Sequence, residues 1–422
     1  MLMLHQAIII GGGPAGIATA LRLHQQTNIQ CTVYELRPEP TTLGGAVGIP
    51  PNGMRLLDRL GVHNKIISRG SSSSLLTIHS MKGHVLVEGD MVGAAKKEIG
   101  YGYVRIKRTD LLDVLLDEAE NAKIPVRYNK QLTTIDDGDA GVEIRFSDGT
   151  TDLADILIGC DGIHSAVRRL YVDPLQAPEY TGMSGLGSII SASVLSDSVA
   201  SQIRGMNLTL AEEGGFGATP CTAAGDQILW GFSKQVELPK SGDTRDGWEV
   251  HRKEEVETFK STLLGLLATA RGDWGNAMRQ IVNKTSAVMF YPIYKLPFEG
   301  TWFKGHVILL GDAAHAMPPH AGQGVSMALE DVFLLSRLLK NPTTPLDDAF
   351  RTFEYIRRPR VDEIAKRAGQ NGAIRHRTGP WGLWIKEVAI SVYMNGIWTL
   401  GLDRWGPQHK HTVYDIDEER VE

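Results

Sequence analysis

The chain has little cysteine, and its cysteines do not suggest a disulfide framework. Only Cys31, Cys160 and Cys221 occur in 422 residues; they lie far apart, and no C-x-x-C pair is present. Three is an odd number, and two of the three fall on strands that we expect in the core. We therefore expect buried free thiols in a reducing, cytoplasmic compartment, and no metal site.

An excess of positive charge is also missing. The formal net charge is −5, so the chain offers no basic field to nucleic acid. No lysine or arginine precedes the apolar N-terminus, which disfavours a signal peptide there. With 42% hydrophobic and 22% charged residues the composition is ordinary, and the length exceeds what a single core usually fills. We expect a globular protein of two intertwined domains.

A glycine-rich turn near the N-terminus is typical of a dinucleotide site. An aliphatic strand (Ala7–Ile10) leads into it, and a helical run to about Gln26 follows. In this context G-x-G-x-x-G provides a tight turn, a close backbone approach to a pyrophosphate, and close packing of helix on strand. A second strand ends in Glu35, nineteen residues after the last glycine, where an acid takes a ribose hydroxyl. The turn consists of Gly11, Gly12, Gly13, Pro14, Ala15 and Gly16.

The stretch 305–331 predicts a second part of the same site. A buried strand (Val307–Leu310) ends near Asp312, whose carboxylate can accept hydroxyl donors from a sugar or ribityl chain. A turn with Gly322 and Gly324 then opens a helix. Backbone N–H groups at a helix N-terminus favour negative charge. We expect both ends of the chain to bind one polar, partly anionic cofactor.

A third motif identifies that cofactor. Another aliphatic strand (Asp155–Gly159) runs into Asp161-Gly162, and an arginine-containing turn lies at 108–111. With the N-terminal glycine turn and Gly311-Asp312, these motifs make the chain resemble the class A flavoprotein monooxygenases, the para-hydroxybenzoate hydroxylase-like family with its salicylate-hydroxylating members. The resemblance covers about residues 5–370 and requires separated motifs to coincide in order.

The resemblance implies tightly held FAD, with NADH or NADPH as co-substrate. Glu35 would bind the adenosine ribose and Asp312 the ribityl chain. Arg108 would face the FAD, and the segment Gly44 to Ile49 would lie along the isoalloxazine. The candidate cofactor-binding residues are Gly11, Gly13, Pro14, Ala15, Gly16, Glu35, Arg37, Gly45, Ala46, Gly48, Arg108, Asp161, Gly162, Asp312, Gly322, Gly324 and Val325.

The expected fold is α/β, with a Rossmann-like FAD-binding domain, an inserted and mostly antiparallel β-sheet substrate domain, and C-terminal helices. The FAD-binding domain is expected to be discontinuous, from residues 1–74, 101–180 and 296–375. Residues 75–100 and 181–295 alternate apolar and polar positions and form the substrate domain. Residues 376–422 form a C-terminal helical segment and tail. No second G-x-G-x-x-G occurs, so the nicotinamide cofactor has no domain of its own.

His320 is the first candidate for catalysis. It lies in the turn before the glycines that would contact the flavin, and salicylate-hydroxylating members of the family also have histidine there. Deprotonation makes a phenol more nucleophilic, which favours an imidazole base at this point. If His320 is only structural, Arg204 or Tyr291 is the alternative catalytic residue. Further candidate pocket residues on the substrate-domain strands are Trp230, Phe232, Phe290 and Tyr294.

Three other features favour structural roles. His315 follows a strand closely and is expected to form a structural hydrogen bond. The stretch 357–360, RRPR, could attract phosphate, but a solvated, kinked helix is preferred. Residues 381–402 are long enough to span a bilayer, yet they carry Lys386 and Glu387. We expect a helix packed on the body of the protein; membrane association is not favoured.

The expected function is that of an FAD-dependent, NAD(P)H-using monooxygenase of secondary metabolism. It would insert one oxygen atom from O2 into an aromatic, phenolic or related small molecule through a flavin C4a-hydroperoxide. An epoxidase or Baeyer–Villiger-type oxygenase on the same scaffold is one alternative, and a non-enzymatic FAD-binding regulator is another. A flavin halogenase is disfavoured because its W-x-W-x-I-P signature is missing: residues 381–384, WGLW, do not supply it.

Overall fold

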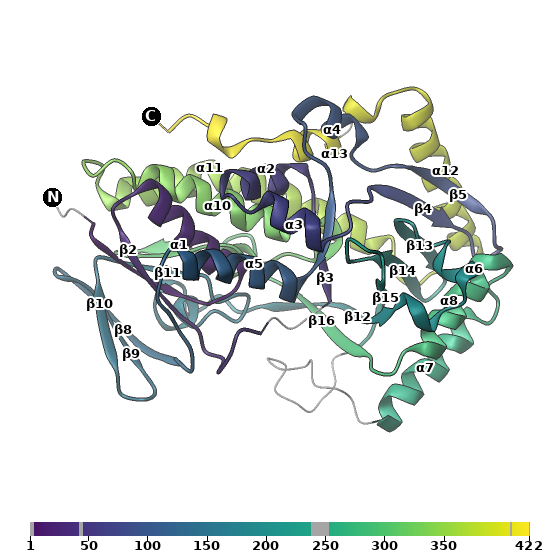
Figure 1. Ribbon diagram of the computed structural model, residues 1–422, viewed down its shortest axis with the longest axis horizontal. Coiled ribbons are helices and arrows are strands. Elements are labelled where there is room, and N and C mark those ends of the chain that lie inside the picture. The colour runs from purple at the N-terminus through teal and green to yellow at the C-terminus, as the bar shows by residue number, and fades with distance from the viewer. Residues whose placement is uncertain (1–3, 42–44, 238–252, 406, 422) are drawn as a thin grey trace.

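The computed structural model describes residues 4–41, 45–237, 253–405 and 407–421. Figure 1 shows two sheets that lie side by side along the long axis of the molecule, with long helices above them. One sheet is mainly parallel and the other mainly antiparallel. This arrangement confirms the predicted α/β class with a second, mostly antiparallel sheet.

The first sheet is built from the aliphatic runs that the sequence marks as buried strands. Its members are β1 (Gln6–Ile10), β2 (Gln30–Tyr34), β7 (Val126–Arg127), β11 (Ile156–Gly159), β17 (Phe303–Lys304) and β18 (Val307–Leu309). They lie in the order β17-β18-β11-β1-β2-β7, and all are parallel except the edge strand β17. Every residue of β11 and β18 is buried, which explains why these runs are apolar without alternation.

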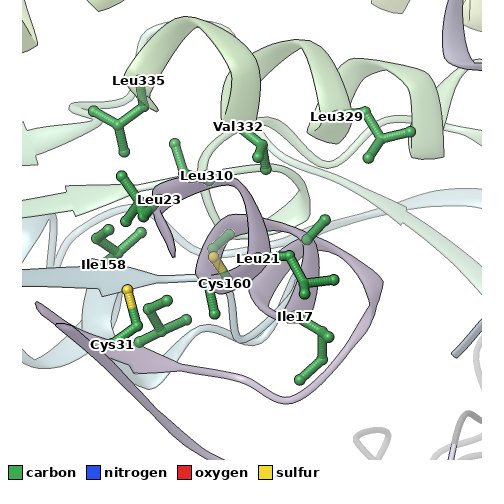
Figure 2. Packing of buried hydrophobic residues seen from close by; sticks show 14 of the residues in the cluster. Ile17, Leu21, Leu23, Cys31, Ile158, Cys160, Leu310, Leu329, Val332 and Leu335 are labelled. Atoms are coloured by element: carbon green, nitrogen blue, oxygen red, sulfur yellow. The ribbon is translucent and has the colours of Figure 1, made fainter. Parts of the chain in front are cut away.

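Two helices pack over this sheet to form the larger core. They are α1 (Pro14–Gln26), which follows the first glycine turn, and α10 (Gly324–Leu338), which follows the second. Figure 2 shows the apolar side chains that meet between them and the sheet, among them Ile17, Leu21, Leu23, Leu329, Val332 and Leu335. Cys31 and Cys160 lie in this core, and all three cysteines are free and buried, which confirms the prediction of buried free thiols. Burial raises the pKa of Cys31 to about 12, so its thiol stays protonated.

The second sheet has seven strands in the order β16-β12-β15-β14-β13-β4-β5, and only the pair β13 and β4 is parallel. Their bounds are β4 (Leu75–His79), β5 (Val85–Asp90), β12 (Glu179–Ser191), β13 (Met206–Ala211), β14 (Gly214–Pro220), β15 (Gln227–Gln235) and β16 (Met289–Lys295). The helices α6 (Asp197–Ala200), α7 (Lys253–Leu267) and α8 (Gly272–Lys284) lie at the same end of the molecule (Figure 1). Side chains of α7 and α8 share a separate hydrophobic core with one face of the sheet.

Two small sheets and several helices connect these layers. A three-stranded meander consists of β8 (Leu132–Gly138), β9 (Gly141–Phe146) and β10 (Thr151–Ala154). A two-stranded ribbon consists of β3 (Ala46–Ile49) and β6 (Val104–Lys107). The remaining helices of this part are α2 (Pro51–Arg59), α3 (His63–Arg69), α4 (Gly93–Ile99), α5 (Arg108–Asn121) and the short α9 (Asp312–His315).

The C-terminal region is helical, with α11 (Leu346–Ala373), α12 (Pro380–Thr399) and α13 (Pro407–Val413). The inner side of α12 packs near β5, where Ser391 Oγ and Asn395 Nδ2 donate hydrogen bonds to the Leu86 carbonyl at 3.0 and 2.9 Å. Trp381 and Val392 point outward and are 80% and 70% exposed. Within the described residues, no helix combines the length and the apolar character that crossing a membrane requires.

Candidate functional site

The three glycines of the N-terminal turn have different surroundings. A Cβ on Gly11, whose φ is +109°, would collide with the carbonyl of Cys160, and a Cβ on Gly16 would collide with the carbonyl of Gly11. Both residues must therefore be glycine for β1, α1 and the end of β11 to pack. A Cβ on Gly13 would meet no atom within 4 Å. The turn thus leaves open space at the middle glycine, where the motif requires backbone to approach a pyrophosphate.

Glu35 lies beside this turn. Its Oε2 accepts a hydrogen bond from the Gly12 N–H at 2.7 Å, and its Oε1 accepts one from the Arg37 N–H at 3.0 Å. Each oxygen of a carboxylate can accept more than one donor, so Glu35 retains capacity for a ribose hydroxyl. The Arg37 side chain turns to Thr41, whose Oγ1 accepts from Nη1 at 2.8 Å.

Asp312 is the exposed residue of an otherwise buried turn. It follows Gly311, which has φ +58°, and it opens α9, whose next three residues are buried. Further along, Gly322 and Gly324 have no atom within 4 Å of an added Cβ. α10 begins at Gly324, followed by the half-buried Val325, so its first backbone N–H groups lie at this glycine turn.

The stretch around Asp161 holds its own loop. Oδ2 of Asp161 accepts hydrogen bonds from the backbone N–H groups of Ala166 and Val167 at 2.6 and 3.2 Å. Its Oδ1 is buried and has no hydrogen-bond partner in the described part of the chain. Burial raises the pKa of the Asp161 carboxyl, since desolvation disfavours its charge. Gly162, with φ +75°, supplies the left-handed residue that this loop needs.

The ribbon of β3 and β6 lies between the glycine turns and the second sheet. The Arg108 N–H, at the start of α5, donates to the Gly45 carbonyl at 3.1 Å. A Cβ on Gly45 would approach Leu229 Cδ1 of β15 at 2.5 Å, so this backbone lies directly against the sheet. Ala46 and Gly48 are paired with β6, and a Cβ on Gly48 would collide with the Tyr103 hydroxyl. Gly44, expected beside the isoalloxazine, lies outside the described residues.

The expectation of a solvated helix at residues 357–360 is wrong. Arg357 is fully buried: its Nε donates to Asp331 Oδ1 and its Nη1 to Glu330 Oε2, both at 2.7 Å. Arg360 is 8% exposed and also donates to Glu330. The reason is that α10 carries two adjacent acids on its buried side, and buried acids require paired cations.

This ionic cluster contacts the turn at Gly311 on one side and the turn before α10 on the other. His315 Nε2 is 2.7 Å from Asp331 Oδ2, which also accepts the Gly311 N–H at 2.9 Å. On the other side, Asn52 Nδ2 donates to Glu330 Oε1 at 2.9 Å and to Gln323 Oε1 at 3.0 Å. Sequence reasoning missed Asn52, Glu330 and Asp331. The available signal was a pair of acids inside the apolar run of α10.

Three candidate pocket residues face away from the ribbon. Trp230, Phe232 and Phe290 lie in the core shared with α7 and α8, and Trp230 Nε1 donates to Thr285 Oγ1 at 2.9 Å. Their placement follows from the strand period of two, because Leu229, which contacts Gly45, lies on the opposite face from Trp230. Their assignment to the pocket is therefore corrected.

The alternative catalytic residues also differ in position. Arg204 lies in the turn before β13, not on a strand; it is exposed, and its Nε donates to the Ser201 carbonyl at 3.1 Å. Tyr291 of β16 lies closer to the site than Arg204, since the charge of Arg108 acts on it. Burial raises the pKa of Tyr291 to about 12, and the charge of Arg108 opposes that shift. Tyr294 stacks edge-on against His164, with ring centroids 5.7 Å apart.

His320 lies in a short turn, η4 (Pro319–Ala321), that packs on the end of α11. A Cβ on Gly372 would lie only 2.7 Å from Cδ2 of His320. The carbonyl of His320 accepts a hydrogen bond from Asn371 Nδ2 at 3.1 Å. Its Nε2 is buried and has no hydrogen-bond partner among the described residues. Burial, together with the neighbouring charges of Arg375 and His376, lowers the pKa of His320 to about 4. The imidazole is therefore neutral at pH 7, and its Nε2 can accept a hydrogen bond.

Fold and site together define a flavoprotein. Its site combines a glycine turn typical of adenine dinucleotides, a carboxylate after the strand β18 (Asp312), and a second glycine turn before α10. The chain belongs to the family described as FAD binding domain, whose model matches residues 5–274 and 298–368. Its cofactor is FAD. The open space at Gly13, the exposed Asp312 and the bare turn at Gly322 and Gly324 are the features that fit this group.

Relatives and solved structures extend over most of the chain. A 3-amino-4-hydroxybenzoate 2-monooxygenase of Streptomyces platensis is 27% identical and covers 86% of this chain and 87% of its own length. A 6-hydroxynicotinate 3-monooxygenase of Pseudomonas fluorescens is 28% identical, with 88% and 92% covered. The structure of Klebsiella pneumoniae HpxO with FAD and uric acid has a TM-score of 0.79 at 21% identity, with 94% and 96% covered.

Proposed function

We propose that this protein is an FAD-dependent, NAD(P)H-using monooxygenase that inserts one oxygen atom from O2 into an aromatic, phenolic or related small molecule. The observation that carries the proposal is His320, two residues before Gly322, whose buried Nε2 has no hydrogen-bond partner within the described ranges of the chain. The names of the relatives support it, since they are monooxygenases of hydroxybenzoate and hydroxynicotinate compounds.

The FAD-binding residues are proposed from the same geometry. The turn at Gly11, Gly13 and Gly16 holds the pyrophosphate, Glu35 the adenosine ribose, and Asp312 the ribityl hydroxyls. Backbone N–H groups at the start of α10 favour negative charge on the bound cofactor. When bound there and reduced by NAD(P)H, the cofactor would supply the activation of O2.

His320 then acts on the substrate. Its Nε2 accepts a hydrogen bond from a phenolic hydroxyl, which polarises the O–H bond and makes the ring a stronger nucleophile toward the oxygen atom. Tyr291 lies where the ribbon of β3 and β6 meets the second sheet, and it is a candidate to orient the ring. Arg108, at the start of α5, would face the FAD. Acceptance of the phenolic hydrogen bond and ring orientation are the contributions that we assign to this chain.

The domain division is also a proposal. Two separate hydrophobic cores support it, one around the parallel sheet and one between the antiparallel sheet and the helices α7 and α8. Residues 1–74, 101–180 and 296–375 would form the FAD-binding part, with 75–100 and 181–295 forming the substrate part. The three buried free cysteines support a reducing cytoplasmic location.

A stimulation assay tests the function. The FAD-loaded protein is mixed with NADH or NADPH under ¹⁸O₂ and a panel of hydroxybenzoates, aminohydroxybenzoates and hydroxynicotinates. We expect at least one compound to accelerate NAD(P)H oxidation and to gain a single ¹⁸O atom on the ring, as seen by mass spectrometry. Epoxide or lactone products would favour the alternative oxygenases. FAD binding without stimulated oxidation would favour a non-enzymatic regulator and contradict the proposal.

A further inference from the structure

Two glycines face each other in the middle of the second sheet. Gly231 of β15 is paired with Gly217 of β14, and Gly217 is paired in turn with Leu208 of β13. Paired residues on neighbouring strands share a face, so these three positions form one row across the sheet. Glycine inside a strand weakens it and often marks a place where a ligand or another backbone approaches closely. This row of glycines therefore requires an explanation.

The glycine row lies on the face of the sheet that meets the proposed flavin site. Leu229, two residues before Gly231, shares its face and contacts Gly45 at the start of the ribbon. The opposite face, which carries Phe216 and Trp230, is buried under α7 and α8. On the face toward the ribbon the side-chain positions of the central strands are only half-buried, namely Ile189, Leu208, Leu210, Gly217, Leu229, Gly231 and Met289.

Three elements touch this face around the glycine row. The ribbon of β3 and β6 touches it at Leu229. The residue after the end of α11, Arg375, lies over Gly215, with its Cγ 3.4 Å from the position of an added Cβ. On the third side, α12 contributes Ile390 to the small apolar cluster in which Leu208 packs. These contacts enclose the row from three sides.

None of the three elements covers the two glycines. A Cβ on Gly217 would have only Leu208 and Asn207 of β13 within 4 Å, and a Cβ on Gly231 would have only the Leu186 carbonyl of β12. These neighbours belong to the sheet itself, so within the described ranges no atom of the ribbon, α11 or α12 comes that close. From Gly231 to Leu208 the row crosses two strand spacings, about 10 Å, which is longer than one aromatic ring.

We propose that the glycine row holds an apolar group which the substrate carries beyond its oxygenated ring, either an alkyl chain or a further ring. The oxygenated ring lies beside His320, whose turn packs on the end of α11, and the apolar group extends over Gly231 and Gly217 toward Leu208. No residue of this row is charged, so burial of apolar surface supplies the affinity. This inference rests on the proposed function and specifies its substrate class.

The test is a chain-length series of alkylphenols bound to the FAD-loaded protein, followed through flavin absorbance and by calorimetry. Phenol and its 2-, 3- and 4-butyl derivatives first identify the preferred position, and methyl to hexyl derivatives at that position form the series. We expect the native affinity to rise about three- to fourfold for each added methylene, the effect of burying one CH₂ group.

Gly217→Leu fills the row with a side chain. It should bind phenol as the native protein does and lose the rise in affinity with chain length, while the smaller Gly217→Ala should lose part of it. Because leucine adds apolar surface, non-specific binding cannot produce this loss. Gly138→Leu is the matched control, at an exposed glycine of β8 with no atom within 4 Å of an added Cβ, and it should keep the full series. Equal FAD content and thermal unfolding show that each variant is folded.

A native affinity that does not rise with chain length would overturn the inference, as would a failure of every butylphenol to bind. A native series in both Gly217 variants would overturn it too, and so would an equal loss for phenol and hexylphenol. The proposed function fails separately: in that case the alkylphenols bind in the expected order, but they neither accelerate NAD(P)H oxidation nor gain oxygen.

Discussion

Arg357 Nε donates to Asp331 Oδ1 at 2.7 Å, and neither side chain has any exposed surface. The second oxygen of Asp331 accepts the Gly311 N–H and lies 2.7 Å from His315 Nε2. One buried ion pair thus connects α11 and α10 to the turn that presents Asp312. The position of a proposed FAD-binding residue depends on a charge pair in the core.

We expect Asp331→Asn to destabilise the protein strongly. It leaves Arg357 buried with one counter-charge fewer, and breaking a buried pair costs about 3–5 kcal/mol. FAD affinity should fall as well, because the turn at Gly311 loses its anionic acceptor. Urea unfolding and FAD titration check the two effects. Asp347→Asn is the control: it removes an exposed pair with Arg351 that water screens, so stability should hardly change. Equal stability of the two variants would contradict the prediction.

Gly13→Val should abolish FAD binding without unfolding the chain. Gly13 has φ −76° and no atom within 4 Å of an added Cβ, so valine is accommodated by the protein itself. Its side chain would instead occupy the space that the pyrophosphate needs. Visible absorbance of the purified variant measures the flavin, and circular dichroism measures the fold. Gly138→Val, at another glycine with open surroundings, should keep its flavin. A folded, stoichiometrically yellow Gly13→Val protein would refute the assignment of the turn.

Asp312→Ala should lower FAD affinity about tenfold to a hundredfold. The change removes a charged acceptor of ribityl hydroxyls, and such a hydrogen bond is worth about 1.5–3 kcal/mol, with each 1.4 kcal/mol a factor of ten. Because Asp312 is exposed, thermal stability of the apoprotein should hardly change. Titration of apoprotein with FAD gives the affinity, and Asp312→Asn, which keeps an acceptor, should be intermediate. Identical dissociation constants for native and Ala proteins would show that Asp312 points elsewhere.

Local patterns explain which features the sequence could predict. The strands β1, β11 and β18 and the glycine turns follow from short aliphatic runs and from positions where only glycine fits, so neighbouring residues suffice to identify them. Arg357 and Glu330 are far apart in the chain, and only the packing of α11 on α10 brings them together. The sequence also could not show which way Trp230 points. Alternation along a strand assigns residues to two faces of the sheet, but it does not show which face the helices cover.

Replacement of His320 separates chemistry from binding. His320→Ala should keep FAD, because Gly13 and Asp312 remain, and it should still consume NAD(P)H, since that step does not use the phenolic proton. Product formation should slow by about 10²–10⁴-fold, the usual contribution of a positioned acid or base. NAD(P)H oxidation would then yield hydrogen peroxide instead of hydroxylated product. The ratio of product to NAD(P)H consumed, with the peroxide yield beside it, is the measurement.

The ratio of product to NAD(P)H consumed should stay constant over a wider pH range than an ordinary histidine would allow. An ordinary histidine, with a pKa of about 6.5, would be about nine-tenths protonated at pH 5.5 and would lose most of its capacity as a base. Burial lowers the pKa of His320 to about 4, so its neutral form persists well below that point. We therefore expect coupling in the native protein to be equal at pH 8 and pH 5.5 and to fall only as the pH approaches 4. A coupling loss centred near pH 6.5 would mean that the proton acceptor is not this buried imidazole.

A fully coupled His320→Ala enzyme would mean that the residue only shapes its turn, and Tyr291 would become the next residue to replace.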